Sequence, residues 1–592
     1  MSEQFLIGLG VIIGFGMLAQ WFAWRLHLPS ILLLLVLGII AGPVTGLVDT
    51  QKLFGNLLFP FVSISVGIIL FEGGLSLHFR EFRDTGKIIR NLISIGALIT
   101  WIISTAAAYF ILEFEFKLAL LFGAILIVTG PTVVLPLLRQ VRPKGNLHSI
   151  AKWEGIMIDP VGAVLAVLVF EEIVSKGFMP YSAVSILGLI KTLIIGFGLG
   201  WLGAQLIIFL LRRYWIPDFL HNSATIMLVI TSFIMSNLLQ HESGLLTVTI
   251  MGIVLANQKK VSIKHIIEFK ENLRILLISS LFIILAARLK MADFSYLNAN
   301  TFLFLGVIIF IARPLSVFIS TFRQKLSWQE KVFLSWLAPR GIVAAAVSSV
   351  FAIELAANGF SDGLRLIPLT FIVIITTVTL YGLSAVPLAR LLKLSEPNPQ
   401  GVLIVGAHYW ARQLGQMIKK LGFRVLMIDS NPGNIEAARF SNLEAVSGNV
   451  LSEDIIDSLN LQGIGRLLAV TPNDEVNALA SLNFAEVFGR SEVYQLSPKK
   501  RKTAPEKAVS RHLRGRCLFN AEYTFDAISE HLNSSEHLQI LEFKSPEDLA
   551  KLDRERMTPL LMVDAQKKLL IVTDESNLKP VVGTKLICLV LK

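Results

Sequence analysis

A succession of long apolar stretches between residue 1 and about residue 393 constrains the fold more than any other feature of the chain. Each stretch approaches the roughly 20 residues that a helix needs to cross the hydrocarbon of a bilayer. Hydrophobic residues make up 54% of the sequence and charged residues 16%, which excludes an ordinary soluble protein, a disordered chain and a secreted disulfide scaffold. Residues 401–592 are mixed polar and apolar, as in a water-soluble domain. We therefore expect a polytopic α-helical membrane protein with a soluble tail.

Thirteen stretches qualify as membrane spans. They lie at about 5–24, 29–48, 57–77, 89–112, 117–138, 151–174, 184–211, 223–239, 243–256, 273–290, 301–322, 331–354 and 366–391. An odd number of spans places the two termini on opposite sides of the membrane. Lysines and arginines, with Arg274 counted among them, are concentrated in the loops after odd-numbered spans, so the positive-inside rule predicts an N-terminus outside and a cytoplasmic tail. We expect a multi-pass protein of the cell (inner) membrane whose first span is retained rather than cleaved as a signal peptide.

The same topology accounts for the net charge of +11, so we expect no nucleic-acid partner. The tail contains one basic run, Lys499 to Lys502, for which contact with anionic membrane lipid and a solvated loop are both open interpretations. Only two cysteines occur, Cys517 and Cys588, and both lie in the tail. This usage fits a reducing compartment.

An ionisable residue inside a predicted span is costly unless it is paired or functional. The candidates of this kind are Glu72, Glu154, Asp159, Arg313 and Arg340. Buried ion pairing explains Glu154 and the two arginines. Two arginines cannot neutralise a third carboxylate, so Asp159 is the strongest functional candidate.

Two of the predicted spans contain helix-breaking residues. Thr129-Gly130-Pro131-Thr132 lies in span five, and Pro339-Arg340-Gly341 lies in span twelve. Proline removes a backbone donor and disrupts the preceding turn, so both spans should unwind at mid-membrane. Such backbone is tolerated in a bilayer where it lines a protein cavity. Corresponding breaks in oppositely oriented spans indicate a secondary transporter built from inverted repeats.

Four motifs together resemble one transporter family. FEGGL at 71–75, TGPT at 129–132, WEGIMIDP at 153–160 and APRG at 338–341 look like the monovalent cation:proton antiporter-1 family, the sodium/proton antiporters. The resemblance covers about 5–391. It implies a thirteen-span fold with a dimerisation part and a core part, crossed unwound spans five and twelve beside the ion site, and a homodimer.

The resemblance also implies roles for individual residues. Asp159 matches the aspartate that alternately binds cation and proton, Glu154 with Arg340 matches a structural ion pair, and Glu72 matches the acidic residue of span three. Thr129 matches a residue that offers oxygen at the helix break. The chain departs from the family at Gly130 and Ile158, where the family usually has aspartate and asparagine. These departures leave sodium and potassium both open as the transported cation.

The site chemistry follows from the residue types as well. A monovalent hard cation is held by oxygen ligands, and Asp159, the hydroxyls of Thr129 and Thr132 and the carbonyls freed near Pro131 would supply them. Removal from water disfavours a bare carboxylate, so a proton and a cation would compete for Asp159. That competition produces exchange.

Residues 401–429 of the tail predict a strand, a turn, a helix and a second strand, the opening of a Rossmann unit. The glycine pattern is degenerate, because Gly406 is followed by His408 and Ala411 at the later glycine positions. Asp429 ends the second strand, at the place of a ribose partner. Dinucleotide binding and a vacant scaffold both remain open on this pattern alone.

Later segments of the tail extend this interpretation. VSGNV at 446–450, with Asn449, and AVTPNDEVN at 469–477, with Thr471, resemble the TrkA-N or regulator-of-potassium-conductance domain over about 401–515. The resemblance implies a bound adenine nucleotide or dinucleotide and a tail dimer. Because His408 crowds the phosphate turn, AMP is favoured over NAD(H), and ATP is a further alternative.

These observations divide the chain into a transmembrane antiporter domain at 1–393, a Rossmann-like domain at 401–515 and a small α/β subdomain at 522–592. The predicted function is exchange of a monovalent cation for protons under control of the nucleotide-binding tail. The alternatives are a nucleotide-gated potassium channel, disfavoured because no TVGYG-like filter occurs, and a membrane sensor that does not transport. We expect no enzyme, because no paired acid, base or nucleophile accompanies Gly406.

Overall fold

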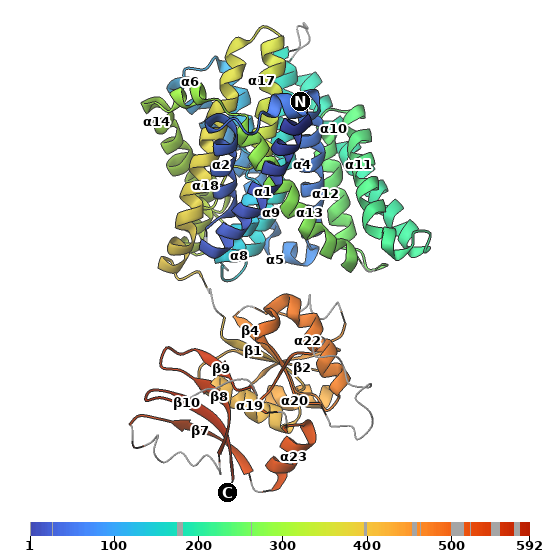
Figure 1. The fold of residues 1–592 in the computed structure, drawn as a ribbon, viewed down its shortest axis with the longest axis vertical. Coiled ribbons are helices and arrows are strands. Elements are labelled where there is room, and N and C mark those ends of the chain that lie inside the picture. Colours follow the sequence, from blue (N-terminus) through green and yellow to red (C-terminus); the bar gives the residue numbers. More distant parts are fainter. Residues whose placement is uncertain are drawn as a thin grey trace. The chain divides into compact units, whose positions relative to one another are not determined.

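The computed structural model forms two compact units, Met1–Ser395 and Glu396–Lys592, which we describe separately (Figure 1). It describes residues 2–591 other than 27, 142, 175–180, 262, 396–398, 453–458, 462, 499–513, 521, 535, 546, 548–556 and 574–579. The basic run at Lys499 to Lys502 therefore lies outside the described residues. The domain boundaries inferred from the sequence remain predictions.

The first unit is a helical bundle, and each predicted span contains helix. The helices are α1 (Ser2–Leu26), α2 (Ser30–Ile39), α3 (Thr50–Phe54), α4 (Leu58–Leu75), α5 (Phe79–Asn91), α6 (Ala97–Ile111), α7 (Phe116–Ile125), α8 (Pro131–Val141), α9 (Leu147–Val174), α10 (Tyr181–Arg212), α11 (His221–Leu239), α12 (Ser243–Ala256), α13 (Lys264–Ala287), α14 (Ala299–Val307), α15 (Arg313–Ser320), α16 (Trp328–Trp336), α17 (Ile342–Ala357) and α18 (Leu366–Leu391). One π-helical turn joins α5 to α6 and another joins α14 to α15, so each pair forms one long helix.

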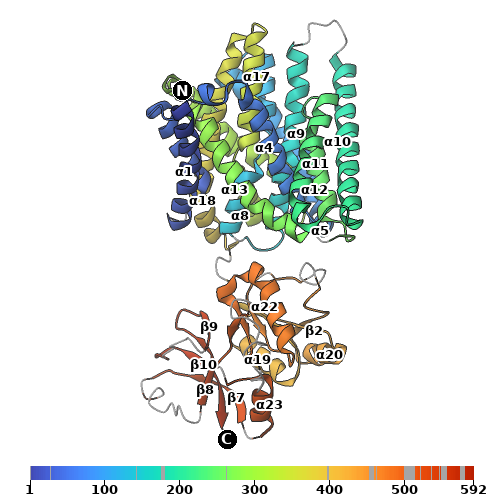
Figure 2. The same cartoon turned by 45° about the vertical axis from the view of Figure 1, so that its right-hand side comes forward.

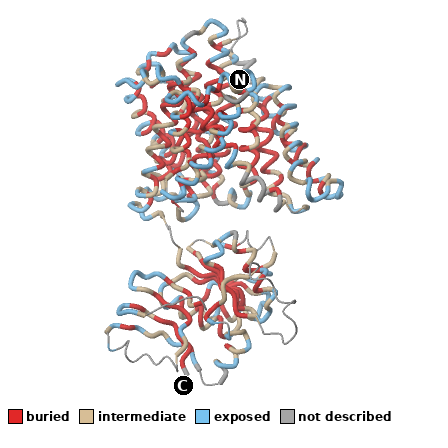
Figure 3. Tube along the Cα trace, viewed as in Figure 1, coloured by how far each residue is buried: buried red, intermediate tan, exposed pale blue. Residues whose placement is uncertain are grey.

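The apolar helices have the dimensions of membrane spans. Within the described residues, seven are long and apolar enough to cross a membrane by length and composition, and five shorter ones are also apolar. Large apolar side chains such as Trp21 and Trp24 of α1 are exposed, while buried residues fill the centre of the bundle (Figure 3). This is the pattern of a bundle that faces lipid. The total of thirteen spans stays a prediction.

The bundle ends are arranged as an odd number of crossings requires. The N-terminus and the end of α18 lie at opposite ends of the bundle in both views (Figures 1 and 2). Buried side chains of α7, α8, α9, α16 and α17 belong to one large apolar core. The two interrupted helices are therefore held inside the bundle, beside α9.

The second unit contains a six-stranded parallel sheet in the order β3-β2-β1-β4-β5-β6. The strands are β1 (Gly401–Val405), β2 (Val425–Asp429), β3 (Glu444–Ser447), β4 (Ile464–Ala469), β5 (Val493–Gln495) and β6 (Arg516–Cys517). All five residues of β1 are buried, as expected for a strand covered on both faces.

Helices cover both faces of this sheet. Val402 and Ile404 pack with α19 (Tyr409–Lys420) and α20 (Pro432–Phe440), whereas Leu403 and Val405 pack with α22 (Asp474–Phe488). The alternation follows from the two-residue period of a strand. The predicted strand, turn, helix and strand at 401–429 are thus confirmed.

The C-terminal segment adds a four-stranded antiparallel sheet in the order β7-β10-β8-β9 and the helix α23 (Phe525–Ser534). Its strands are β7 (Glu536–Glu542), β8 (Met557–Val563), β9 (Leu569–Ile571) and β10 (Lys585–Leu591). The predicted strand pair about a turn is confirmed as β8 and β9. Side chains of this segment share an apolar core with α19, so the small sheet is packed against the Rossmann-like sheet.

Candidate functional site

The two helix breaks predicted from the sequence are present in the bundle. Residues 126–130 separate α7 from α8, and residues 337–341 separate α16 from α17. Pro131 begins α8, where the missing amide costs no helical hydrogen bond. Both non-helical segments are buried, so their free backbone groups must find partners within the protein.

The two breaks touch each other at a pair of glycines. A Cβ atom placed on Gly130 would lie 2.4 Å from the Cα of Gly341, and a Cβ on Gly341 would lie 2.4 Å from the Cα of Gly130. Such a separation is far shorter than a van der Waals contact, so neither position has room for a side chain. An aspartate, which the resemblance leads us to expect at position 130, would have no room in this arrangement.

Asp159 lies on the face of α9 that meets the first break. Gly155, Asp159 and Gly162 are separated by four and three residues and so share one helix face. A Cβ on Gly155 would lie 3.6 Å from the carbonyl oxygen of Thr129, and one on Gly162 would lie 3.4 Å from the amide nitrogen of Val128. Small residues above and below Asp159 thus allow α9 to approach the unwound segment.

Several buried oxygens at this place have no hydrogen-bond partner in the described part of the chain. Asp159 is 0% exposed and both of its carboxylate oxygens are unsatisfied, as is the hydroxyl of Thr132. Buried polar atoms in native proteins nearly always have partners. Three unsatisfied buried oxygens near the non-helical backbone match the oxygen preference of a hard monovalent cation. Thr129 is also buried at the break.

Glu154 pairs with Arg313, so the predicted pairing with Arg340 is wrong. Both terminal nitrogens of Arg313 donate to the two carboxylate oxygens of Glu154, and the Nη2–Oε2 distance is 3.0 Å. Arg313 also donates to the carbonyl of Leu334 near the end of α16. The pair joins α9 to α15 because the planar guanidinium matches a carboxylate in bidentate geometry.

Arg340 has a different role from the one predicted. Its Nη1 donates to the carbonyls of Ile127 and Val128, each at 3.3 Å, and its amide donates to Thr377 Oγ1 at 3.2 Å. These carbonyls are released where α7 ends, and a helix C-terminus favours a positive charge. Arg340 therefore ties the second break to the first.

Glu72 lies near the end of α4 and pairs with Arg274 of α13 at an Nη1–Oε1 distance of 3.1 Å. Sequence reasoning treated Arg274 as one of the cytoplasmic loop charges that set topology. It lies in a helix instead, with a largely buried side chain. No motif around Arg274 marks it, and only the packing of α13 on α4 brings the two residues together.

In the tail, the predicted residues meet at the carboxyl edge of the parallel sheet. Gly406 follows β1 with φ of +105°, a conformation that favours glycine. Asp429 at the end of β2 accepts hydrogen bonds from the Ala407 amide at 2.7 Å and from the Asn434 side chain at 2.9 Å. The carboxylate holds the turn in shape and already has internal partners.

His408 occupies the space above Gly406. Its Nε2 lies 2.8 Å from the carbonyl of Val470, and its ring packs on Trp410 and Phe525 with centroid distances of 4.6 and 4.9 Å. A Cβ on Gly406 would be 3.4 Å from the ring. Burial lowers the pKa of His408 and favours the neutral imidazole. The predicted crowding is confirmed, and the contact from Phe525 of α23 was not foreseen.

The remaining predicted tail residues have mainly structural contacts. Ala411 is fully buried in α19. Thr471 Oγ1 lies 2.8 Å from the side-chain oxygen of Asn477, and Asn449 accepts a hydrogen bond from the Leu451 amide at 3.0 Å. Asn449 is exposed, so it remains available to a ligand at this edge.

Comparison with known proteins gives one family match in each of the two units. Residues 11–391 match the sodium/hydrogen exchanger transmembrane family, and residues 402–498 match the TrkA-N domain, a Rossmann-type nucleotide-binding domain. The K(+)/H(+) antiporter NhaP of Alkalimonas amylolytica is 26% identical over 66% of this chain and 67% of its own length. The Na(+)/H(+) antiporter 1 of Methanocaldococcus jannaschii is 26% identical over 59% of this chain and 84% of its own.

The fold of the first unit is likewise similar to a solved structure. The sodium proton antiporter MjNhaP1 from Methanocaldococcus jannaschii has a TM-score of 0.57 at 26% identity, over 65% of this chain and 97% of that chain. The similarity covers a share of the chain comparable to that of the bundle. It supports the same helical architecture for this protein.

Proposed function

Because the chain belongs to the sodium/hydrogen exchanger family, we propose that it exchanges a monovalent cation for protons across the cell membrane. The observation that carries this proposal is Asp159, a fully buried carboxylate without a hydrogen-bond partner in the described part of the chain. A buried charge without a partner is costly. A cation or a proton bound at Asp159 removes that cost, and both would bind at the same oxygens.

The exchange proceeds by alternation at this carboxylate. Oxygens of Asp159, Thr132 and Thr129, with carbonyls of the first break, surround the cation. A proton that binds Asp159 cancels its charge and releases the cation. Relatives are named for sodium and for potassium, and Gly130 removes a carboxylate that the family usually has. The cation is therefore assigned as monovalent without a choice between the two.

Reconstitution of the full chain in proteoliposomes tests this proposal. Addition of sodium, potassium or lithium should move protons, reported by a pH-sensitive dye, and Asp159→Asn should abolish the movement because an amide cannot exchange a proton. Asp362→Asn is the matched control, since Asp362 is exposed and should leave the rate unchanged. Exchange at the unsubstituted rate in folded Asp159→Asn would exclude Asp159 as the carrier.

The proposal extends to assembly and orientation. We place the protein in the cell membrane as a homodimer, with the N-terminus outside and the tail in the cytoplasm, in keeping with the resemblance and the loop charges. Cysteine labelling of an N-terminal and a C-terminal position in intact cells tests the orientation. Labelling of both termini by an impermeant reagent would contradict it.

For the tail, we propose that an adenine nucleotide binds at the carboxyl edge of β1, β2 and β4 and changes the transport rate. The match to the TrkA-N domain and the glycine turn at Gly406 support a nucleotide. His408 lies where a pyrophosphate would approach the backbone, so AMP is favoured over NAD(H) and ATP. Binding alters transport only if the ligand favours one arrangement of the tail over another.

Thermal melting of the full-length protein with AMP, ATP, NAD and NADH tests the tail assignment. AMP should raise the melting temperature, because a ligand of the native state stabilises it by mass action. His408→Gly should allow stabilisation by NADH, since it removes the ring from the turn. The absence of a shift with all four ligands would leave the tail as a scaffold.

A further inference from the structure

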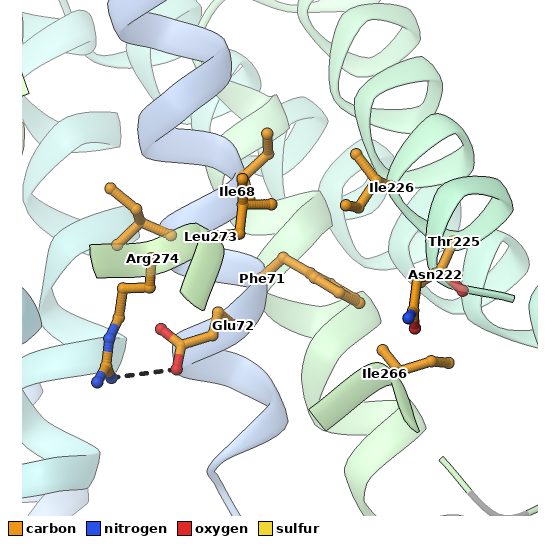
Figure 4. Close-up of a pocket in the computed structure, with 10 residues that line it drawn as sticks. Ile68, Phe71, Glu72, Asn222, Thr225, Ile226, Ile266, Leu273 and Arg274 are labelled. Carbon is orange, nitrogen blue, oxygen red and sulfur yellow. Dashed lines mark hydrogen bonds and ion pairs between the residues drawn. The ribbon is translucent and has the colours of Figure 1, made fainter. Parts of the chain in front are cut away.

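Glu72 and Arg274 form a buried ion pair between two helices that line the interior of the bundle. Their side chains are 8% and 11% exposed, and the dashed contact in Figure 4 joins Glu72 on α4 to Arg274 on α13. The neighbouring Gly73 packs on Ile156, with 3.5 Å from its Cβ position to that side chain. Ile156 precedes Asp159 by about one helical turn of α9, so Glu72 lies on a helix, α4, that packs against α9 beside the candidate cation site.

The same two residues line two separate hollows. One hollow lies between α4, α11 and α13 and has mostly apolar walls (Figure 4). The other extends to Pro131 and Thr132 at the start of α8. Ile69, Glu72 and Arg274 line both. The ion pair is therefore part of the wall shared by the two hollows, and one of these reaches the unsatisfied hydroxyl of Thr132.

A carboxylate in this wall attracts any cation that enters either hollow. Arg274 already satisfies that carboxylate with a guanidinium that the chain itself supplies. When a metal ion takes the place of the guanidinium, the Glu72 carboxylate has a positive partner both before and after the exchange. The exchange keeps the Glu72 carboxylate paired, and the Arg274 guanidinium that it releases remains beside the two hollows that this side chain lines.

From this geometry we propose that Arg274 is a tethered cation that occupies Glu72 when no transported ion is near and that competes with the incoming ion for this carboxylate. Arg274 is thus a positioning residue that sets the apparent affinity of the antiporter. The inference rests on the proposed cation:proton exchange. A purely structural pair would instead affect stability alone.

Removal of the competing charge has opposite effects on affinity and turnover. In Arg274→Gln the Glu72 carboxylate faces the hollows without this guanidinium, so the KM for the cation should fall about tenfold. The cation should also leave more slowly, so the maximal rate should fall, as expected when ground-state binding tightens. Arg274→Lys keeps the charge and should keep KM within about twofold of the unsubstituted protein.

A double-substitution cycle assigns the effect to Glu72. Glu72→Gln should raise KM, and adding Arg274→Gln in that background should change KM no further, because the carboxylate for which the guanidinium competes is gone. The double variant leaves no stranded charge, which keeps the comparison possible if Arg274→Gln alone folds poorly. Arg365→Gln is a matched control, since Arg365 lines neither hollow.

The measurements are KM and maximal rate in proteoliposomes, with cation-induced thermal stabilisation of each variant as an independent measure of binding. A KM in Arg274→Gln that is unchanged or raised, while exchange continues, would overturn the inference. A lower melting temperature with an unchanged KM would do the same and leave the pair structural. If the unsubstituted protein shows no cation-dependent proton movement, the proposed antiport itself fails, which is a distinct result.

Discussion

The contact between the two unwound helices makes Gly341 a suitable position for a substitution that perturbs the proposed ion site. Gly341→Ala adds one methyl group, and the Cβ atom of that group would lie 2.4 Å from the Cα of Gly130. Gly341 has φ of −117° and ψ of −172°, an extended backbone that alanine adopts without strain. The entire effect of the substitution must therefore be steric, and the atom it meets is backbone that cannot rotate away.

The size of the effect follows from that distance. Ordinary contact begins near 3.4 Å, whereas the added atom would lie at 2.4 Å, so the helices must separate by about 1 Å. Overpacking of this kind typically costs about 1–3 kcal/mol. A displacement of about 1 Å in a functional site lowers rates about 100-fold. We expect transport to fall by more than the loss of stability explains.

Proteoliposome exchange and thermal melting of the same preparation measure the two effects. Gly306→Ala is the control, because nothing lies within 4 Å of a Cβ at Gly306 in α14. Alanine there should keep wild-type transport and gain stability, since glycine in a helix costs about 0.5–1 kcal/mol relative to alanine. If Gly341→Ala melts and transports like the unsubstituted protein, the close crossing at Gly130 is refuted.

Three further outcomes are expected. Arg313→Ala should lower the free energy of unfolding by about 3–5 kcal/mol because it leaves the Glu154 carboxylate without its partner. Thermal melting of Arg313→Ala and of the double variant Glu154→Gln/Arg313→Gln checks this, since the double variant should recover part of the loss. Exchange should be electroneutral, so its rate should not respond to a potassium–valinomycin potential; a strong response would indicate a second titrating group. Burial lowers the pKa of His408, so the free energy of unfolding of the tail should decline as pH falls below about 6.5, the ordinary pKa of histidine. In thermal melts across the pH range, His408→Gln should make that decline smaller.

Much of the bundle was predictable because the relevant signals are local. Apolar length locates the helices, and Pro131 and Pro339 locate the breaks, since each acts on its own segment. Asp159 was identifiable by counting charges within spans. The same local reasoning correctly anticipated that His408 would crowd the turn after Gly406.

The incorrect predictions concern which helices pack against each other. Arg313 and Arg340 are equivalent candidates for Glu154 in sequence, and only the packing of α9 against α15 distinguishes them. Arg274 resembled a loop charge because its helix begins with a polar segment. Gly130 was recognised as a missing carboxylate, but its contact with Gly341, more than 200 residues away, is a long-range property that sequence spacing does not encode.

The pairing of charges gives a physical reason to expect electroneutral exchange. Among the candidate residues named from the sequence, Glu154 is neutralised by Arg313 and Glu72 by Arg274. Asp159 and Arg340 remain, and Arg340 donates to backbone carbonyls of the first break. A bound proton and a bound monovalent cation add the same single charge to Asp159. The two loaded forms of the site therefore carry equal charge, so the membrane potential acts equally on both and favours neither direction of exchange.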